Sequence, residues 1–457
     1  MSNIIITTHW TDGDVIPFIR IGEMLKKRGH KVTLLTHCYY RKLARDAGLE
    51  FTSWDTEEQY KNMMHDMSSY SDTVAGLEEI RAFREKYEGI NVRLSEFEKI
   101  QQHCSEKDTV ILAKNRSSVA ALMASEKFNI PIILFFMNPY EIGSMINFHS
   151  LNKDQLKDEA NILRSCVGLP QIHSWLSWQS SPKVQLALWP EWFLKEMPEW
   201  PHPVRTVGFP LKIPKSHSLR MIPGEISAIL EKDPTPVLIT GGTSRQIKSD
   251  FYTTAIEACR ILGKKTIVVT RFRELLPERL PSNVSWFQHV PLDTILPHMG
   301  AVINHGGIGT VSGAVYAAAP QLALACYVDR PLNASRIKSL GIGEYLPPSY
   351  WDPALIAEEI KKLLKPEYKQ KCMRFAEELP KDEALAEVCK TAESISGNEL
   401  YSISHKEILD NVFSANNYHL IDGTTGADKN RKKSKLQNLS PEVREFILRK
   451  KLETNKD

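Results

Sequence analysis

The sequence has few cysteines, no long apolar run and little net charge. Its seven cysteines form no Cys-x-x-Cys pair and no Cys/His spacing typical of zinc sites. We therefore expect reduced thiols rather than a disulfide framework, and no bound metal. Lys and Arg number 58 against 55 Asp and Glu, so the net charge of +3 does not indicate a protein that coats nucleic acid.

Segments that would direct the chain into a membrane are also missing. The N-terminus lacks the basic and apolar regions of a signal peptide. The longest apolar stretches, residues 130–137 and 314–328, fall short of the roughly 20 residues that a transmembrane helix needs. The expected location is the cytoplasm, and peripheral contact with a membrane surface is left open.

What the chain does contain is a regular alternation of strands and helices. A β-branched run, a helical segment and a second apolar run fill the first 35 residues, which predicts a βαβ unit and a parallel sheet. The pattern then repeats, and the expected strands cover residues 3–7, 31–35, 109–113, 132–137, 184–188, 236–240, 266–270, 284–287, 301–304 and 322–325. Continuous apolar strands between helices indicate an α/β fold with sheets covered on both faces.

The 457 residues are enough for two or three domains. We predict Rossmann-like domains over residues 1–212 and 236–396, a proline-containing linker over 213–235, and a cleft between the domains. The last helix of the second domain is able to cross back to the first. Residues 397–457 are predicted to form a polar, basic tail with a terminal helix over 440–452. Either this tail docks on a biosynthetic partner or an anionic membrane, or it folds back on the catalytic body.

A glycine-rich turn between an expected strand and an expected helix is the most informative segment. It contains His305, Gly306, Gly307, Gly309 and Thr310. Such a turn directs backbone N–H groups and the positive end of a helix to one point, which favours phosphate binding. It lacks the Lys-Ser/Thr of a Walker A motif, and its glycine spacing differs from the dinucleotide fingerprint. A tight turn without a ligand is the alternative.

Several motifs together resemble a known family. They are His305-Gly-Gly-Ile-Gly-Thr310, Ala318-Ala-Pro-Gln-Leu322, Asp329-Arg-Pro-Leu-Asn-Ala-Ser-Arg336, Asp12-Gly-Asp-Val-Ile-Pro-Phe18, Leu186-Ala-Leu-Trp-Pro-Glu191 and Thr206-Val-Gly-Phe-Pro210. In this order they resemble the signatures of family 1 glycosyltransferases of the bacterial antibiotic and sterol type, over roughly residues 1–395. The resemblance implies the GT-B fold, a UDP- or TDP-sugar donor in the second domain, and an acceptor in the first.

The resemblance also implies where the nucleotide and its phosphates bind. His305 and the helix start with Gly306, Gly307, Gly309 and Thr310 would hold the diphosphate. A second group of residues matches the positions near the base and the phosphates: His289, Val290, Thr243 and Ser244. A surface-loop histidine and a plain polar turn are the alternatives for this second group.

Three further residues match the sugar-binding motif. Asp329 stands where the family binds sugar hydroxyls, and Asn333 belongs to the same motif. Arg330 departs from the pattern, because the family usually has Gln there. Since an Arg fork reads carboxylate or phosphate, a plain hexose is not assumed. The alternative is that Arg330 only neutralises Asp329.

Asp14 is the first candidate for the general base, because it follows the first strand, where α/β sheets place their sites. His9 and Asp12 share its loop and are rivals. Inverting transfer needs one base for the acceptor hydroxyl, and the family resemblance implies that no metal or other cofactor takes part. We expect a lipid-like or secondary-metabolite acceptor. The competing hypotheses are a GT-B nucleotide-sugar epimerase and a non-catalytic partner protein.

The acceptor site is predicted least well. Five first-domain residues are candidates for an apolar pocket: Met63, Met64, Met67, Trp175 and Trp178. Ordinary core packing is the alternative for all of them.

Overall fold

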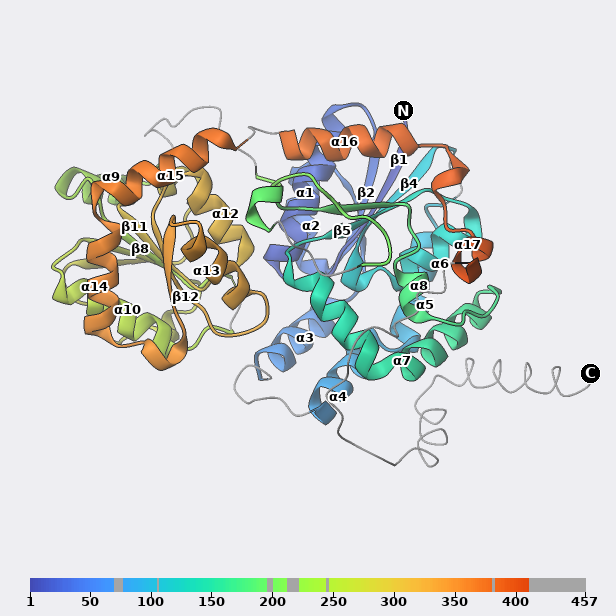
Figure 1. Ribbon diagram of the computed structural model, residues 1–457, viewed down its shortest axis with the longest axis horizontal. Coiled ribbons are helices and arrows are strands. Elements are labelled where there is room, and N and C mark those ends of the chain that lie inside the picture. The colour runs from blue at the N-terminus through green and yellow to red at the C-terminus, as the bar shows by residue number, and fades with distance from the viewer. Residues whose placement is uncertain are drawn as a thin grey trace, which may run out of the picture.

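The computed structural model describes residues 1–69, 77–104, 107–194, 200–211, 222–243, 246–379 and 383–410. They form two domains side by side, each with one parallel sheet between helices (Figure 1). The α/β fold predicted from the sequence is confirmed. The predicted helix over 440–452 lies outside the described residues. Within those residues, no helix has both the length and the apolar character needed to cross a membrane.

The first domain contains a seven-stranded parallel sheet in the order β3-β2-β1-β4-β5-β6-β7. Its strands are β1 (Asn3–Thr7), β2 (Lys31–Thr36), β3 (Glu50–Ser53), β4 (Thr109–Lys114), β5 (Ile132–Phe136), β6 (Val184–Ala187) and β7 (Arg205–Thr206). Its helices are α1 (Asp12–Lys27), α2 (Arg41–Asp46), α3 (Glu57–Ser69), α4 (Leu77–Glu88), α5 (Ile90–Gln101), α6 (Val119–Phe128), α7 (Tyr140–Cys166) and α8 (Trp175–Gln179). Ile4 and Ile6 pack in one core cluster and Ile5 in another, so both faces of β1 are buried.

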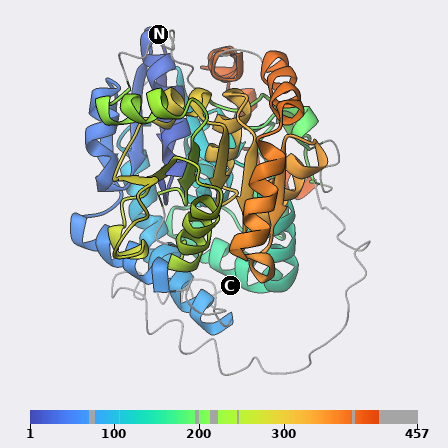
Figure 2. The ribbon, with the colours of Figure 1, turned by 90° about the vertical axis from the view of Figure 1, so that its left-hand side faces the viewer.

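The second domain contains a six-stranded parallel sheet in the order β10-β9-β8-β11-β12-β13. Its strands are β8 (Val237–Thr240), β9 (Thr266–Val269), β10 (Val284–Phe287), β11 (Ala301–Asn304), β12 (Gln321–Leu324) and β13 (Gly343–Leu346). Its helices are α9 (Gly224–Lys232), α10 (Ser249–Ile261), α11 (Leu292–Ile295), α12 (Ile308–Tyr316), α13 (Arg330–Ser339), α14 (Pro353–Leu363) and α15 (Pro366–Glu378). Figure 2 views the molecule from the side of this domain, whose yellow and orange elements lie in front of the blue first domain.

Three strands that the sequence did not predict lie at sheet edges. They are β3, β7 and β13. Each is short and only partly buried, so none carries the continuous apolar run that marks a central strand. The inner strands have that run because helices cover both of their faces.

The predicted linker over 213–235 is too long at its C-terminal end. Helix α9 lies inside that range, and Ile226 on this helix is fully buried. Ile222 and Ile226 pack in the same core cluster as Leu238 of β8. The prolines around this helix suggested a linker, whereas its apolar face belongs to the second domain.

The predicted tail over 397–457 begins too early. Helix α16 (Glu383–Ile395) lies along α1 of the first domain, and Leu385 and Val388 join the core beside β1 (Figure 1). A short 3-10 turn (Glu399–Tyr401) and α17 (His405–Asp410) follow. Ile403 and Ile408 are buried in the first-domain core, so residues up to 410 are part of the folded body.

A chain ended after residue 398 should therefore be markedly less stable than a chain ended after residue 410. The shorter chain loses Ile403 and Ile408 from the core and the hydrogen bond from the Ile403 N–H to Ser125 Oγ. Burial of two aliphatic side chains contributes roughly 3–6 kcal/mol. Urea unfolding followed by tryptophan fluorescence measures the difference. Equal unfolding midpoints for the two chains would contradict this assignment.

Candidate functional site

A large cavity of about 1310 Å³ lies between the two domains and is lined by residues from both. It opens at the carboxyl ends of the strands. In each sheet the strand order reverses once in the centre, between β1 and β4 in the first and between β8 and β11 in the second. Parallel α/β sheets bind ligands where the order reverses, because the loops diverge there and leave a crevice.

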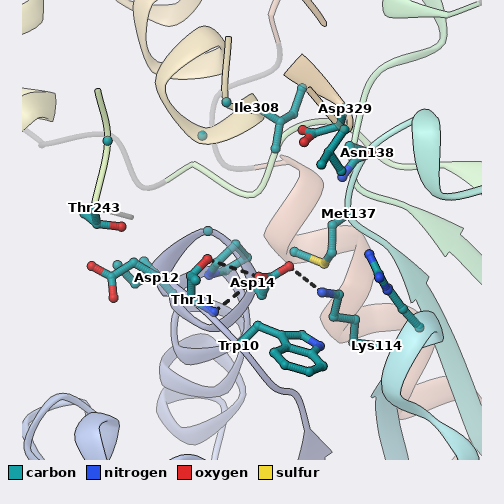
Figure 3. A pocket seen from close by; sticks show the side chains of 18 of the residues that line it. Trp10, Thr11, Asp12, Asp14, Lys114, Met137, Asn138, Thr243, Ile308 and Asp329 are labelled. Atoms are coloured by element: carbon teal, nitrogen blue, oxygen red, sulfur yellow. Dashed lines mark hydrogen bonds and ion pairs between the residues drawn. The ribbon is translucent and has the colours of Figure 1, made fainter. Parts of the chain in front are cut away.

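Asp14 lines the first-domain wall of the cavity and is held by three donors. Thr11 caps α1, and its N–H and Oγ1 donate to Asp14 Oδ2 over 3.3 and 3.2 Å. Lys114 Nζ donates to the other carboxylate oxygen, Oδ1, as Figure 3 shows. Lys114 ends β4, and β4 pairs with β1, so the switch point of the sheet brings together two residues far apart in the sequence.

Lys114 and Glu141 are site residues that the sequence analysis missed. Both line the cavity and are buried, and Lys114 Nζ lies 3.8 Å from Glu141 Oε1. Burial raises the pKa of Glu141 to about 7, although the charge of Lys114 acts in the opposite direction. A lysine at the end of an apolar strand next to β1 was the available signal, since a buried cation there needs a partner.

His9, a predicted rival to Asp14, does not line this cavity. Its ring stacks on Trp54, and its Nε2 lies 2.6 Å from Glu96 Oε1. Burial lowers the pKa of His9. The ring is thus a buried group packed against Trp54 and Glu96.

Asp12, the other candidate for the general base, lines the cavity, but its carboxylate already accepts hydrogen bonds. Its carboxylate accepts from Tyr40 Oη over 2.9 Å and from Arg271 Nη2 over 3.1 Å. Arg271 follows β9, so this ion pair links the two domains across the cavity. Asp12 therefore holds the domains together at the site.

On the opposite wall, the glycine-rich turn follows β11 and opens α12. Gly307 is the N-cap of α12, and His305 precedes it. A Cβ on Gly242 would lie 2.6 Å from His305 Cε1, and one on Gly307 would lie 2.4 Å from His305 Nε2. Both glycines are needed because the imidazole fills the space between the two turns.

His305 is neutral in this environment. Burial lowers its pKa to about 3, and the charge of Arg330 acts in the same direction. His305 Nδ1 is buried without a hydrogen-bond partner among the described residues. His305 lines the cavity, and as a neutral ring it can donate one hydrogen bond, whereas it carries no charge to attract an anion.

Gly306 and Asn333, both predicted to bind the donor, do not line the cavity. They instead connect the glycine-rich turn with the start of α13, next to Asp329. Gly306 has a φ of +84°, and its N–H donates to Asn304 Oδ1 over 2.8 Å. Asn333 Nδ2 donates to the Gly306 carbonyl over 3.0 Å and to Asp329 Oδ2 over 2.9 Å. Asn333 thus orients Asp329, whose carboxyl lines the cavity and whose pKa is raised by burial.

The remaining predicted donor residues fall into two groups. Residues that line the cavity are Thr243, His289, Val290, Gly307, Gly309, Thr310, Asp329 and Arg330. His289 is exposed and Val290 is buried. Ser244 lies outside the described residues. In Figure 3, Ile308 at the start of α12 and Asp329 lie across the cavity from Asp12.

The first-domain part of the cavity is mainly apolar. Its wall includes Met67, Ile90, Phe83, Met145, Phe148, Leu156, Leu163 and Trp175. Among the charged residues there, Arg84 and Glu159 form an ion pair of 2.9 Å. Of the five predicted acceptor residues, Met67 and Trp175 line the cavity, Met63 and Trp178 are buried in the core, and Met64 is half-buried and does not line the cavity.

Comparisons with known families agree with this geometry. The family model of the glycosyltransferase family 28 N-terminal domain matches residues 4–135. The C-terminal domain described as erythromycin biosynthesis protein CIII-like matches residues 263–395. These matches cover the loop that carries Asp14 and the glycine-rich turn at His305. The chain belongs to the family 1 glycosyltransferases. It is an enzyme of the GT-B fold that uses nucleotide-sugar donors.

Relatives of this glycosyltransferase are distant in sequence. An uncharacterised protein of Mycobacterium bovis is 24% identical over 389 residues, which are 79% of this chain and 89% of the relative. The sterol 3-beta-glucosyltransferase of Saccharomyces cerevisiae is 23% identical over 394 residues, 74% of this chain but only 30% of that protein.

Solved structures share the fold. The calicheamicin glycosyltransferase CalG4 superposes with a TM-score of 0.65 at 16% identity, over 87% of this chain and 99% of that chain. The glycosyltransferase VinC, solved with dTDP, superposes with a TM-score of 0.60 at 18% identity, over 86% of this chain and all of that chain.

Proposed function

We propose that this glycosyltransferase moves a sugar from a UDP- or TDP-sugar to a hydroxyl of an apolar acceptor, with inversion at the anomeric carbon. The observation that carries the proposal is the position of Asp14. Its carboxylate lies at the boundary between the apolar part of the cavity and the wall formed by Asp329 and the start of α12. A hydroxyl bound beside Asp14 would approach the sugar from the side opposite the leaving diphosphate.

Asp14 is the proposed general base. Transfer requires removal of the acceptor hydroxyl proton as the new bond forms, and a carboxylate within hydrogen-bond reach can accept it. Lys114 and Thr11 hold this carboxylate in one orientation through donors to both of its oxygens. A base held in one orientation favours the reaction, because its carboxylate does not have to rotate after the acceptor has bound.

The diphosphate is proposed to bind at His305 and the start of α12. The backbone N–H groups of Ile308 and Gly309 are the first of a helix and lack intrahelical acceptors, so they can donate to phosphate oxygens, whereas the Thr310 N–H already donates to the Gly307 carbonyl over 3.0 Å. We propose that these donors stabilise the leaving diphosphate without a metal ion or other cofactor, because negative charge grows on it in the transition state.

The acceptor is proposed to be lipid-like or a secondary metabolite. The support is the cavity wall of Phe83, Phe148, Leu163 and Trp175, which favours binding of an apolar molecule. Two relatives point in the same direction through their names, a sterol 3-beta-glucosyltransferase and a calicheamicin glycosyltransferase.

The proposal is tested by incubating the protein with UDP- and TDP-sugars and a panel of hydroxylated sterols and polyketides. We expect diphosphate release that depends on the acceptor, together with a glycoside of inverted anomeric configuration by NMR. Release or sugar isomerisation without any acceptor would favour a nucleotide-sugar epimerase. Retained configuration in the product would exclude the proposed direct displacement.

A further inference from the structure

Arg330 is a buried cation in the wall of the cavity. It is the first residue of α13, and only 7% of its surface is exposed. Its Nη2 donates to Gln246 Oε1 over 2.8 Å, and the guanidinium lies 5.7 Å from the ring centre of Tyr327. Its Nη1 is buried and has no hydrogen-bond partner among the described residues. The described residues therefore provide a hydrogen-bond acceptor for only one of the two terminal nitrogens of this guanidinium.

Arg330 makes no ion pair with Asp329, its neighbour in sequence, although its charge acts to lower the pKa of that carboxyl against the larger effect of burial. Within the described part of the chain, no carboxylate lies within 4.0 Å of the Arg330 guanidinium. Asp329 Oδ2 accepts instead from Asn333 Nδ2. The alternative considered from the sequence, in which the two residues only cancel each other's charge, is thus not supported by the geometry.

A buried guanidinium without an anionic partner is unfavourable, because desolvation is not compensated. The partner is expected to arrive with the substrate. The position of Arg330 indicates which part of the substrate would supply this anion. A Cβ on Gly306 would lie 2.8 Å from the Arg330 carbonyl, so the Arg330 turn packs directly on the glycine-rich turn. The guanidinium itself lies at Gln246 and Tyr327, and its charge acts on both His305 and Asp329, so an anion bound to it would face these two residues.

The diphosphate has other donors in this wall, since His305 and the start of α12 face the cavity. In the proposed function, the sugar would lie beyond the diphosphate, next to Asp329. Resting on the proposed function, we infer that the donor sugar carries a carboxylate, as in a hexuronate, and that Arg330 determines this specificity. Arg330 Nη1 would donate to the carboxylate while Asp329 accepts from the sugar hydroxyls. Planar recognition of this kind suits Arg better than Lys or Gln.

The test is isothermal calorimetry with four probes: the nucleoside diphosphate, the hexose derivative, the hexuronate derivative and the nucleoside monophosphate. The nucleotide, UDP or TDP, is the one whose diphosphate binds more tightly. We expect the wild-type protein to bind the nucleotide-hexuronate at least about tenfold more tightly than the nucleotide-hexose. In Arg330→Gln this ratio should fall to about one, and Arg330→Lys should retain part of it.

Arg116→Gln is the matched control, because Arg116 is an exposed cation on the cavity wall of the first domain. It should leave the hexuronate preference within about twofold of wild type, since long-range charge is screened by salt. Circular dichroism checks that each variant is folded, and the wild-type preference tests the inference even where a variant is not.

Two results would overturn the inference. One is a wild-type protein that binds the hexose and hexuronate derivatives equally. The other is an Arg330→Gln variant that loses the diphosphate and the hexose derivative as strongly as the hexuronate derivative, because Arg330 would then contact phosphate. If neither diphosphate binds the wild type, the proposed function itself fails. Binding of the diphosphate without hexuronate preference contradicts this inference alone.

Discussion

Asp14→Asn is expected to lower turnover by about 10²–10⁴-fold while the affinity for the nucleoside diphosphate stays close to wild type. The amide cannot accept the acceptor proton. It keeps an oxygen that can accept from the Thr11 N–H, so the start of α1 should remain capped. Turnover under saturating donor and calorimetric titration with the diphosphate measure the two effects separately.

Asp12→Asn is the matched control for this variant. It removes the same charge from the same turn of α1, but Asp12 contacts Tyr40 and Arg271 rather than Lys114. We expect its turnover to fall by less than about tenfold, as for loss of a partly exposed ion pair. A larger loss in Asp12→Asn than in Asp14→Asn would transfer the role of base to Asp12.

His305→Ala should weaken diphosphate binding by roughly 10–100-fold and lower turnover further. In the proposed function, the neutral ring would supply one hydrogen bond to the diphosphate, and this bond would strengthen as charge develops on the leaving group. Calorimetry with the diphosphate and single-turnover kinetics report the two contributions.

The nucleoside monophosphate provides an internal control for His305→Ala. If His305 contacts the outer phosphate, loss of affinity should be larger for the diphosphate than for the monophosphate. His305→Asn should recover part of the affinity, because its amide can donate from the same turn. Equal affinity of wild type and His305→Ala for the diphosphate, with unchanged turnover, would remove His305 from the site.

The sequence was sufficient to predict the α/β class and the inner strands of both sheets. Inner parallel strands are buried on both faces, so the runs Asn3–Thr7 and Ala301–Asn304 are visible without any tertiary information. The glycine-rich turn was also predictable, since Gly307 is required locally by close approach of the His305 ring. The edge strands β3, β7 and β13 and the helix among prolines at Gly224–Lys232 were not, because their packing partners are distant in the chain.

The residues of the candidate site likewise divide into those that the sequence identified and those that only the tertiary structure identified. Asp14, His305 and Asp329 stand in local motifs, and the sequence alone identified them as candidates. Only the tertiary structure separated His9, buried against Trp54, from Asp14 at the cavity, since both follow the same strand. It also brought Lys114 to Asp14, because the neighbouring strands β1 and β4 are remote in sequence but end at the same edge.

The inference about Arg330 depends on both the sequence and the tertiary structure. The sequence marked it as a departure from the family motif, and a guanidinium beside Asp329 suggested a simple charge pair. In the folded chain, Asp329 instead accepts a hydrogen bond from Asn333. One nitrogen of Arg330 is buried without a partner among the described residues. Residue type is local, whereas burial and pairing depend on elements packed from elsewhere in the chain, so only the tertiary structure determined what this charge can bind.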